Sequence, residues 1–271
     1  MKTENNLLNR KPYNSFLADI VDYYFYIDMP VAQLSAQPEY MIPFPRITFG
    51  YFFDHPFTAT NHSANESVLV KVAISRIKKK KITVQPQTER VKILAAHLKP
   101  FGLAYFTQKP IHTLPWLIDT EELYGDIARR FLKKVNSSNS VEQMFDEVEK
   151  VFLENILIRD LSLITNAVEL IENSEGQIEV AELSRQLGVS ERTLRNHFYD
   201  HIGCSPKEYL RIVKLKRIVY QMKHSKDLLT RIAYDNDYFD QAHFIKEIKN
   251  ITGHPPNKLR KEISDFRFLQ F

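Results

Sequence analysis

The sequence predicts an α+β protein in which a small antiparallel β barrel and a helical hairpin precede an all-helical C-terminal domain. Three observations predict this class. Short apolar runs broken by turn residues fill the first hundred residues, helical periodicity begins near residue 120, and an internal repeat occupies the last ninety residues. The 271 residues are 44% hydrophobic and 26% charged, which is ordinary for a globular chain of two domains.

Five runs in the first hundred residues have the length and composition of β-strands. Each is rich in Val, Ile, Tyr or Phe, and clusters of turn-forming residues such as Pro43–Pro45 and Asp54–Ser67 separate them. Strands this short, at about ten-residue spacing, are typical of a small antiparallel barrel or sandwich, and we expect a barrel. The expected strands are Tyr23–Ile27, Arg46–Phe53, Val68–Arg76, Lys81–Gln85 and Val91–Leu98.

Helical periodicity begins after residue 118. Apolar residues recur at helical intervals over Leu123–Val135 and Val141–Ile156, and Ser140 is placed to cap the second helix. The pattern predicts a helical hairpin, whose second stripe would either pair with another chain or pack on the β domain. We therefore divide the chain into a β-rich sensor or assembly domain (1–118), the hairpin, with a role in dimerisation as one alternative (119–158), and a C-terminal domain (159–271).

Composition excludes several classes of protein. The chain has seven glycines and lacks a glycine-rich phosphate-binding motif, and its one cysteine, Cys204, excludes an intrachain disulfide and a cysteine-based zinc site. No apolar run is long enough to cross a bilayer and the start is polar, so we expect a cytoplasmic protein. We also expect no cofactor. Residues 176–271 hold 17 Lys and Arg against 12 Asp and Glu, whereas the preceding part is nearly neutral. This asymmetry points to an anionic partner, nucleic acid first.

The internal repeat lies within residues 178–264. Apolar, glycine and proline positions recur in the same order about fifty residues apart. The clearest pairs are Phe198 with Ile248, Gly203 with Gly253, and Pro206 with Pro256. Two similar segments of this size indicate that one supersecondary element is used twice.

Each copy has the pattern of a helix-turn-helix unit. In the first copy Gly188 stands in the turn, where a positive φ is needed, and Ser190 is placed to cap the second helix. In the second copy Asp227 and Asp240 are the expected caps. Asp237 stands where Gly188 stood, and Asp adopts the left-handed region less readily than Gly, so we expect a strained or altered turn.

A continuous helix is expected between the two units. Ser205 and Glu208 form a capping box around Pro206, and an apolar stripe runs from Ile212 to Met222. Two helix-turn-helix units joined by one long helix resemble the arabinose-regulator (AraC/XylS) family of transcription factors.

The resemblance covers about residues 160–265. Leu229–Phe244 is similar to the signature of the family's second unit and Lys249–Leu259 to its end, with a departure at Asp237, where the family usually has Gly. The resemblance implies a sequence-specific transcriptional regulator that binds double-stranded DNA and contacts RNA polymerase. It further implies a cupin-like N-terminal domain that senses a small effector and supports a homodimer.

The second helix of each unit is expected to enter a major groove, in two successive grooves about 34 Å apart. Arg and Lys suit guanine, Asn and Gln suit adenine, and Ala suits the thymine methyl group. The resemblance places base-reading residues at Arg192, Arg195, Asn196, Gln241, Ala242 and Lys246. Flanking cations expected to contact phosphates are Lys216, Arg217, Lys249 and Lys258.

Two other functions are compatible with the sequence. A cupin-type metal enzyme would use histidines of the barrel, but no His-x-His pair occurs there and the spacings match no common ligand set. These histidines are His55, His62, His97 and His112. A DNA-bound scaffold would regulate through protein contacts and need no small ligand. We expect no catalytic and no metal-binding residues, leave the effector-binding residues unassigned, and expect Lys78–Lys81 to form a solvated hairpin turn rather than a nucleic-acid patch.

Overall fold

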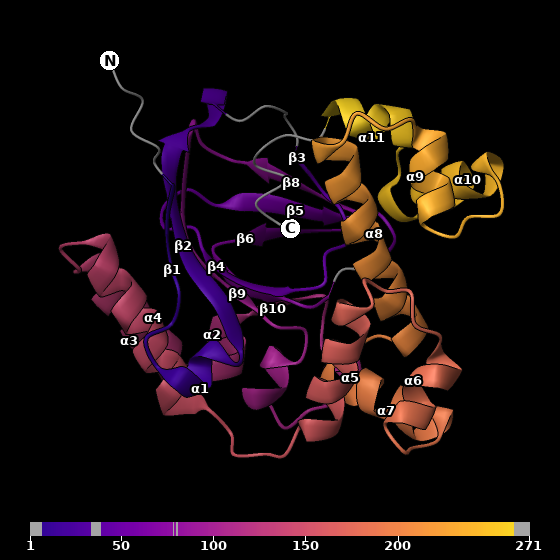
Figure 1. Ribbon diagram of the computed structural model, residues 1–271. Helices are drawn as coiled ribbons and strands as arrows, with labels where there is room; N and C mark the ends of the chain where they lie inside the picture. The colour runs from indigo at the N-terminus through magenta and orange to yellow at the C-terminus, as the bar shows by residue number, and fades with distance from the viewer. Residues whose placement is uncertain (1–6, 34–38, 78, 80, 263–271) are drawn as a thin grey trace.

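The computed structural model describes residues 7–33, 39–77, 79 and 81–262 (Figure 1). The β-rich part and the helical C-terminal part lie side by side, with α8 (Pro206–His224) along their boundary. Within the described residues, the strands form two antiparallel sheets, a large one in the order β1-β2-β9-β4-β7-β10 and a small one in the order β3-β8-β5-β6. The strands are β1 (Leu7–Arg10), β2 (Val21–Pro30), β3 (Glu39–Met41), β4 (Ile47–Tyr51), β5 (Phe57–Asn61), β6 (Glu66–Val70), β7 (Val72–Ser75), β8 (Ile82–Pro86), β9 (Arg90–Leu98) and β10 (Leu117–Asp119).

The two sheets face each other and do not close into the expected barrel. Phe57 and Val84 of the small sheet share an apolar core with Ile93 and Ala95 of the large sheet. No strand of one sheet is hydrogen-bonded to a strand of the other in the part of the chain that is described. The α+β order is confirmed, and the barrel is corrected to an open arrangement of two sheets.

All five expected strand regions contain strand, and two segments need correction. Val68–Arg76 is divided at Lys71, because the residues before Lys71 pair with β5 in the small sheet and those after it pair with β4 in the large sheet. Asp54–Ser67, expected as a loop, contains β5, whose buried Phe57 and Ala59 alternate among turn-forming residues. The strands β1, β3 and β10 are only three or four residues long, too short to give a periodic signal.

The large sheet is buried on both faces, as β9 shows most clearly. Its residues Ile93 and Ala95 face the small sheet, whereas the intervening Leu94, Ala96 and Leu98 face the helices. A strand covered on both sides needs apolar residues at nearly every position, which explains the continuous apolar run in this segment.

The helical hairpin covers the outer face of the large sheet (Figure 1). It consists of α3 (Asp126–Asn136) and α4 (Val141–Asn155), and Ser140 caps α4 by accepting a hydrogen bond from the Gln143 N–H at 3.3 Å. Phe145 is fully buried, and its ring lies 6.1 Å from that of Tyr24 in β2. The apolar face of α4, which the sequence left to pair either with another chain or with the β domain, therefore packs on the β domain.

The C-terminal part is built from short helices around α8. Among the described helices, none combines the length and apolar character that a bilayer span requires. The remaining helices are α1 (Ser15–Ala18), α2 (Thr120–Tyr124), α5 (Ser162–Asn173), α6 (Val180–Gln186), α7 (Glu191–His201), α9 (Leu229–Asp235), α10 (Gln241–Thr252) and α11 (Pro256–Glu262), with 3-10 turns η1 (Val31–Gln33), η2 (Gly102–Tyr105) and η3 (Ile111–Thr113).

Two apolar cores meet along α8. Tyr209 and Ile212, in its first half, belong to a core that is continuous with the helix-covered face of the large sheet. Ile218 and Met222, in its second half, belong to the core of the second helix-turn-helix unit. Ile42, between β3 and β4, lies in this second core and is 2% exposed. The N-terminal part therefore packs against both units.

A buried group of charges joins the two parts. Arg46 donates two hydrogen bonds to the carboxylate of Glu172 on α5, at 2.5 and 3.0 Å, and Tyr209 donates to the same carboxylate at 2.6 Å. Arg46 also pairs with Asp22, and its side chain is 11% exposed. Burial opposes charge on Glu172, but the bonds from Arg46 and Tyr209 outweigh this and lower its pKa.

Two lysines of the run after β7, Lys79 and Lys81, contact the C-terminal part, and the Lys79 side chain is also 46% exposed. Lys79 Nζ lies 3.0 Å from the carboxylate of Glu208. The side chain of Lys81 lies so close to Gly253 that a Cβ there would come within 2.7 Å of it. Lys78 and Lys80 lie outside the described residues.

Candidate nucleic-acid interface

The first unit consists of α6 and α7. Gly188, with φ at 67°, allows the turn between them, and the Ser190 hydroxyl accepts a hydrogen bond from the Thr193 N–H at 3.1 Å. Leu194 and Phe198 are fully buried. The predicted turn and cap are confirmed, and α7 is fixed by its apolar face.

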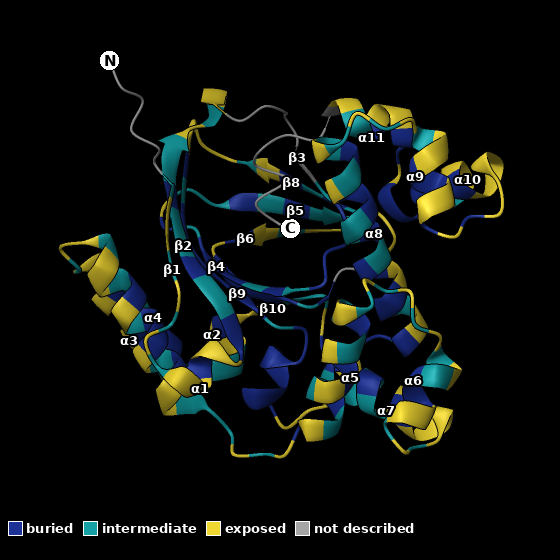
Figure 2. Cartoon of the chain, viewed as in Figure 1, coloured by how far each residue is buried: buried dark blue, intermediate teal, exposed yellow. Residues whose placement is uncertain are grey.

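The opposite face of α7 is exposed (Figure 2). Arg192, Arg195 and Asn196 all lie on this face, so the three residues expected to read bases in the first unit are brought together. A hollow beside α7 is lined in part by Arg192, Arg195 and Lys207, together with Glu179 and Glu191. No sequence pattern singles out Lys207, because its neighbours indicate only the start of the connecting helix.

The second unit consists of α9 and α10. Asp237 occupies the turn with φ at 56°, so the expected left-handed conformation is present, and its carboxylate accepts a hydrogen bond from Gln177 at 3.2 Å. Asp240 caps α10 by accepting from the His243 N–H at 2.7 Å. The prediction of Asp227 as the cap of α9 is wrong, because α9 begins one residue later and its N-cap, Leu228, makes no side-chain cap bond.

The exposed face of α10 carries Gln241, Ala242 and Lys246, the residues expected to read bases in the second unit. Ile245 lies beside them with 37% of its surface exposed. Phe244 on the opposite side is fully buried, so α10, like α7, is fixed by an apolar face.

The helix α8 holds the two units at a fixed separation. Its 19 residues span about 28 Å at 1.5 Å per residue, so one continuous helix connects the two units. The second unit is braced against α8 by an ion pair of 2.9 Å between Arg211 and Glu247 and by Lys214 Nζ, 4.7 Å from the centre of the Tyr238 ring. Both units lie on the side of α8 away from the sheets (Figure 1).

The four cations expected to contact phosphates fall into two groups. Lys249 and Lys258 are exposed on the second unit. Lys216 is half-buried near the charges of Arg46 and Glu172, and burial lowers its pKa. The other half-buried cation, Arg217, bonds within the chain, pairing with Glu175 at 3.1 Å and donating to the carbonyl of Asp235 at 3.2 Å.

The histidines of the N-terminal part do not form a common site. His55 and His62 contact the hydroxyls of Thr88 and Thr83. His97 is buried between the sheets, and His112 lies 3.6 Å from Asp200 on α7. Within the described ranges, no group of three or more His, Cys, Asp or Glu side chains is placed to hold a metal ion.

Comparison with known proteins identifies the C-terminal segment. Residues 183–262 match a family model described as a helix-turn-helix domain. The transcriptional activator RhaS of Mannheimia succiniciproducens is 30% identical over 91 residues, which cover 34% of each chain. The Msm operon regulatory protein of Streptococcus mutans is 30% identical over 102 residues, which cover 37% of each chain. The chain thus matches about a third of the length of these curated relatives.

One solved structure extends the likeness to the whole chain. ToxT of Vibrio cholerae superposes with a TM-score of 0.51 and 11% identity, over 96% of this chain and 99% of that one, which is a likeness of fold. A further ToxT structure, with a TM-score of 0.50 at 12% identity over 97% of this chain and 98% of that one, is described as bound to an unsaturated fatty acid.

The C-terminal part is therefore a double helix-turn-helix domain of the kind that binds DNA. This domain is similar to the DNA-binding domain of AraC/XylS-type regulators, as its repeat and signature segments indicate.

Proposed function

We propose that this protein regulates transcription by binding a specific DNA site with both helix-turn-helix units, one in each of two successive major grooves. The observation that carries the proposal is that α7 and α10 each have a buried apolar face and an exposed face with the predicted base-reading residues, and that both helices lie on the side of α8 away from the sheets (Figure 1). In this proposal Arg195 and Lys246 each pair with a base, and Arg192, Asn196, Gln241 and Ala242 complete the two contact surfaces.

The proposed set of phosphate-contacting residues differs from the set expected from the sequence. Lys249 and Lys258 remain phosphate contacts because they are exposed on the second unit. Lys207 joins them, since it lies beside the proposed base-reading arginines of α7. Lys216 and Arg217 are assigned to holding α8 within the molecule, because both are half-buried and contact groups of the same chain.

Control by the N-terminal part is a further element of the proposal. The relatives named above are regulators, and a ToxT structure contains a fatty acid, so we propose that this chain also binds a small effector. Homodimerisation, contact with RNA polymerase and location in the cytoplasm, where the DNA of the bacterial relatives lies, belong to the same proposal. An enzymatic role has no support from the histidines described above.

The test begins with selection of bound DNA from a random library, followed by affinity measurements with variants. Arg195→Ala and Lys246→Ala should each weaken binding by about 5- to 150-fold, equivalent to 1–3 kcal/mol, and each should relax sequence preference in a different part of the site. Lys150→Ala is the matched control, because Lys150 is an exposed cation on α4, which lies across the sheets from the C-terminal units (Figure 1). Unchanged affinity in both test variants would remove these two helices from base recognition.

Salt dependence provides a second measurement on the same complex. Affinity should fall steeply with salt concentration, and removal of one phosphate-contacting lysine should reduce the magnitude of the slope by about one. Lys249→Ala and Lys258→Ala should show this change. If both variants show the same salt dependence of affinity as the wild-type protein, Lys249 and Lys258 are excluded as phosphate contacts.

A further inference from the structure

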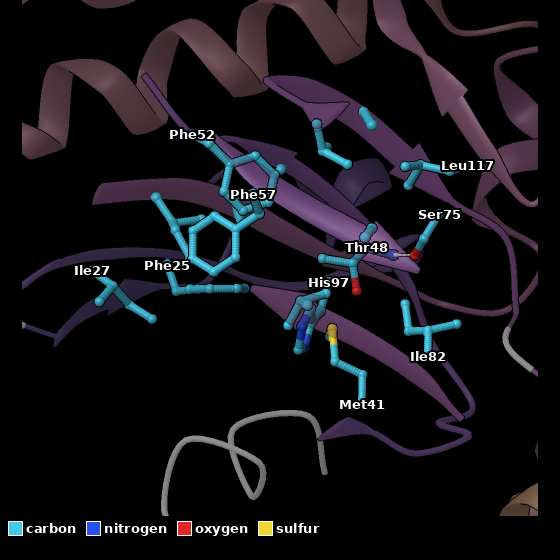
Figure 3. A pocket seen from close by; sticks show the side chains of 17 residues that line it. Phe25, Ile27, Met41, Thr48, Phe52, Phe57, Ser75, Ile82, His97 and Leu117 are labelled. Carbon is cyan, nitrogen blue, oxygen red and sulfur yellow. Dashed lines mark hydrogen bonds between the residues drawn. The ribbon is translucent and has the colours of Figure 1, made fainter. Parts of the chain in front are cut away.

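An apolar cavity lies between the two sheets of the N-terminal part (Figure 3). Its volume is about 120 Å³. Phe25, Phe52 and Phe57 surround one end, with the rings of Phe52 and Phe57 5.0 Å apart. These rings would lie against the faces and edges of another ring placed among them.

The other end of the cavity has the few polar groups of its lining. His97 is 3% exposed and lies against the rings of Tyr23 and Phe25, both 5.0 Å from its centre. Thr48 is half-buried beside it, and the Thr48 N–H donates to the hydroxyl of Ser75 at 3.3 Å (Figure 3). The imidazole and two hydroxyls can therefore meet one polar group of a ligand, at a single end of the cavity.

The size of the cavity limits the ligand to a single ring. An apolar protein cavity of about 150 Å³ is large enough to hold benzene, and the volume here is somewhat smaller. A fatty-acid chain or a fused ring system would not fit wholly within this volume. A ring of six carbon atoms with one small substituent fills the space.

The lining disfavours charged ligands and ligands that carry many hydroxyl groups. No Lys, Arg, Asp or Glu is among the described residues that line the cavity. An ionised carboxylate would lose its hydration without gaining a cationic partner. A sugar would leave most of its hydroxyl groups against phenyl and aliphatic surfaces without hydrogen-bond partners.

We propose that the cavity binds a neutral single-ring aromatic compound that carries one hydroxyl group, a phenol, with the ring among Phe25, Phe52 and Phe57 and the hydroxyl against His97 and Thr48. Its role as the effector site rests on the proposed function, whereas the binding itself does not. The inference departs from the fatty acid found in ToxT, because this lining offers a carboxylate no cation.

The test is calorimetric titration of the intact protein, without DNA, using phenol, benzoate, toluene and a pentose as probes. Phenol should bind with a dissociation constant on the order of 0.1–1 mM, suited to so small a ligand. Benzoate should bind at least ten-fold more weakly, and the pentose should give no signal. Benzoate or pentose binding as tight as that of phenol, or no phenol signal up to 10 mM, would overturn the proposal.

Two variants locate the site. Ala95→Val adds two methyl groups from β9 into the cavity and should weaken phenol binding at least ten-fold. Thr48→Val removes a hydroxyl at nearly constant size and should weaken phenol binding about five-fold without affecting toluene. Thr58→Val is the matched control, since Thr58 lies between two cavity residues of β5 and does not line the cavity. Phenol affinity unaltered by Ala95→Val would place the binding elsewhere.

The outcome is separable from that of the DNA experiments. A protein that binds selected DNA but not phenol retains the proposed function and loses this inference. A protein that binds phenol in this cavity but no DNA retains the site and loses its role as an effector site.

Discussion

Replacement of Glu172 tests how strongly the two parts of the molecule are held together. The Glu172 carboxylate accepts three hydrogen bonds, two from Arg46 and one from Tyr209, and it lies between the N-terminal part and α8. Glu172→Gln keeps the size of the side chain but removes its charge and one acceptor oxygen. Arg46 would remain paired with Asp22 but would lose its bidentate partner.

The expected loss of stability follows from these contacts. A hydrogen bond to a charged group contributes about 1.5–3 kcal/mol. The Glu172 side chain is 31% exposed, so solvent screens part of this, and the remaining contact with Tyr209 offsets another part. We expect a loss of about 2 kcal/mol at pH 7, which corresponds to a decrease of about 4–8 °C in melting temperature.

The dependence on pH distinguishes this carboxylate from a packing effect. Because the folded-state pKa of Glu172 lies below its ordinary value of 4.5, its contribution is present above that value. It disappears as the pH falls through the folded-state pKa, so wild-type protein and variant should converge in acid.

Thermal and urea unfolding measured from pH 7 to pH 3 provide the assay. Glu169→Gln, an exposed change on the same helix, is the control and should alter stability by less than about 0.5 kcal/mol. Equal stability of wild-type protein and Glu172→Gln at pH 7, or a difference that persists unchanged in acid, would refute the reasoning.

Three further predictions concern the C-terminal units. Gly188→Ala should lower the free energy of unfolding by about 1 kcal/mol, and Asp237→Gly should raise it by about 0.5 kcal/mol, because both turns have positive φ. Urea unfolding that changes this free energy in the same direction for both variants would contradict the prediction. Ser205→Ala should cost about 1 kcal/mol by breaking the reciprocal cap with Glu208, and an unchanged urea midpoint would show that the cap does not contribute. Cys204 is fully buried and burial raises its pKa, so a thiol reagent should label it only after denaturation; rapid labelling of native protein would indicate that the first unit opens readily.

The helical part was predictable because its signals are local. The caps Ser140, Ser190, Ser205 and Asp240 and the left-handed turn at Asp237 follow from the side chain and backbone preferences of single residues. The cap of α9 was misplaced by one residue, the scale on which helix ends are commonly ambiguous.

The sheets were less predictable because strand pairing joins distant segments. No sequence pattern near Lys71 indicates that the chain leaves the small sheet and enters the large one there. The strand β5 was also not predicted, because it lies within a segment rich in Asp, Asn and Ser. Sheet closure depends on pairing between edge strands, which residue composition does not encode.

The sequence predicts which residues of the candidate site are exposed, but it does not predict which cations contact other groups inside the protein. The helical period places Arg192, Arg195 and Lys246 opposite buried residues of their own helices. The same period cannot show that Lys216 faces Arg46, because these residues are brought together only by tertiary packing. The cavity between the sheets is likewise a product of which alternate residues meet across two layers.

The position of Ile42 bears on how the molecule can be divided for expression. Its side chain completes a cluster formed otherwise by residues of α8 and the second unit. A fragment comprising residues 159–271 would leave a hydrophobic depression at that point and would also lack the surface that covers Tyr209. Truncation at the boundary suggested by composition would therefore expose apolar surface in both clusters, and the fragment should aggregate more readily than the full chain.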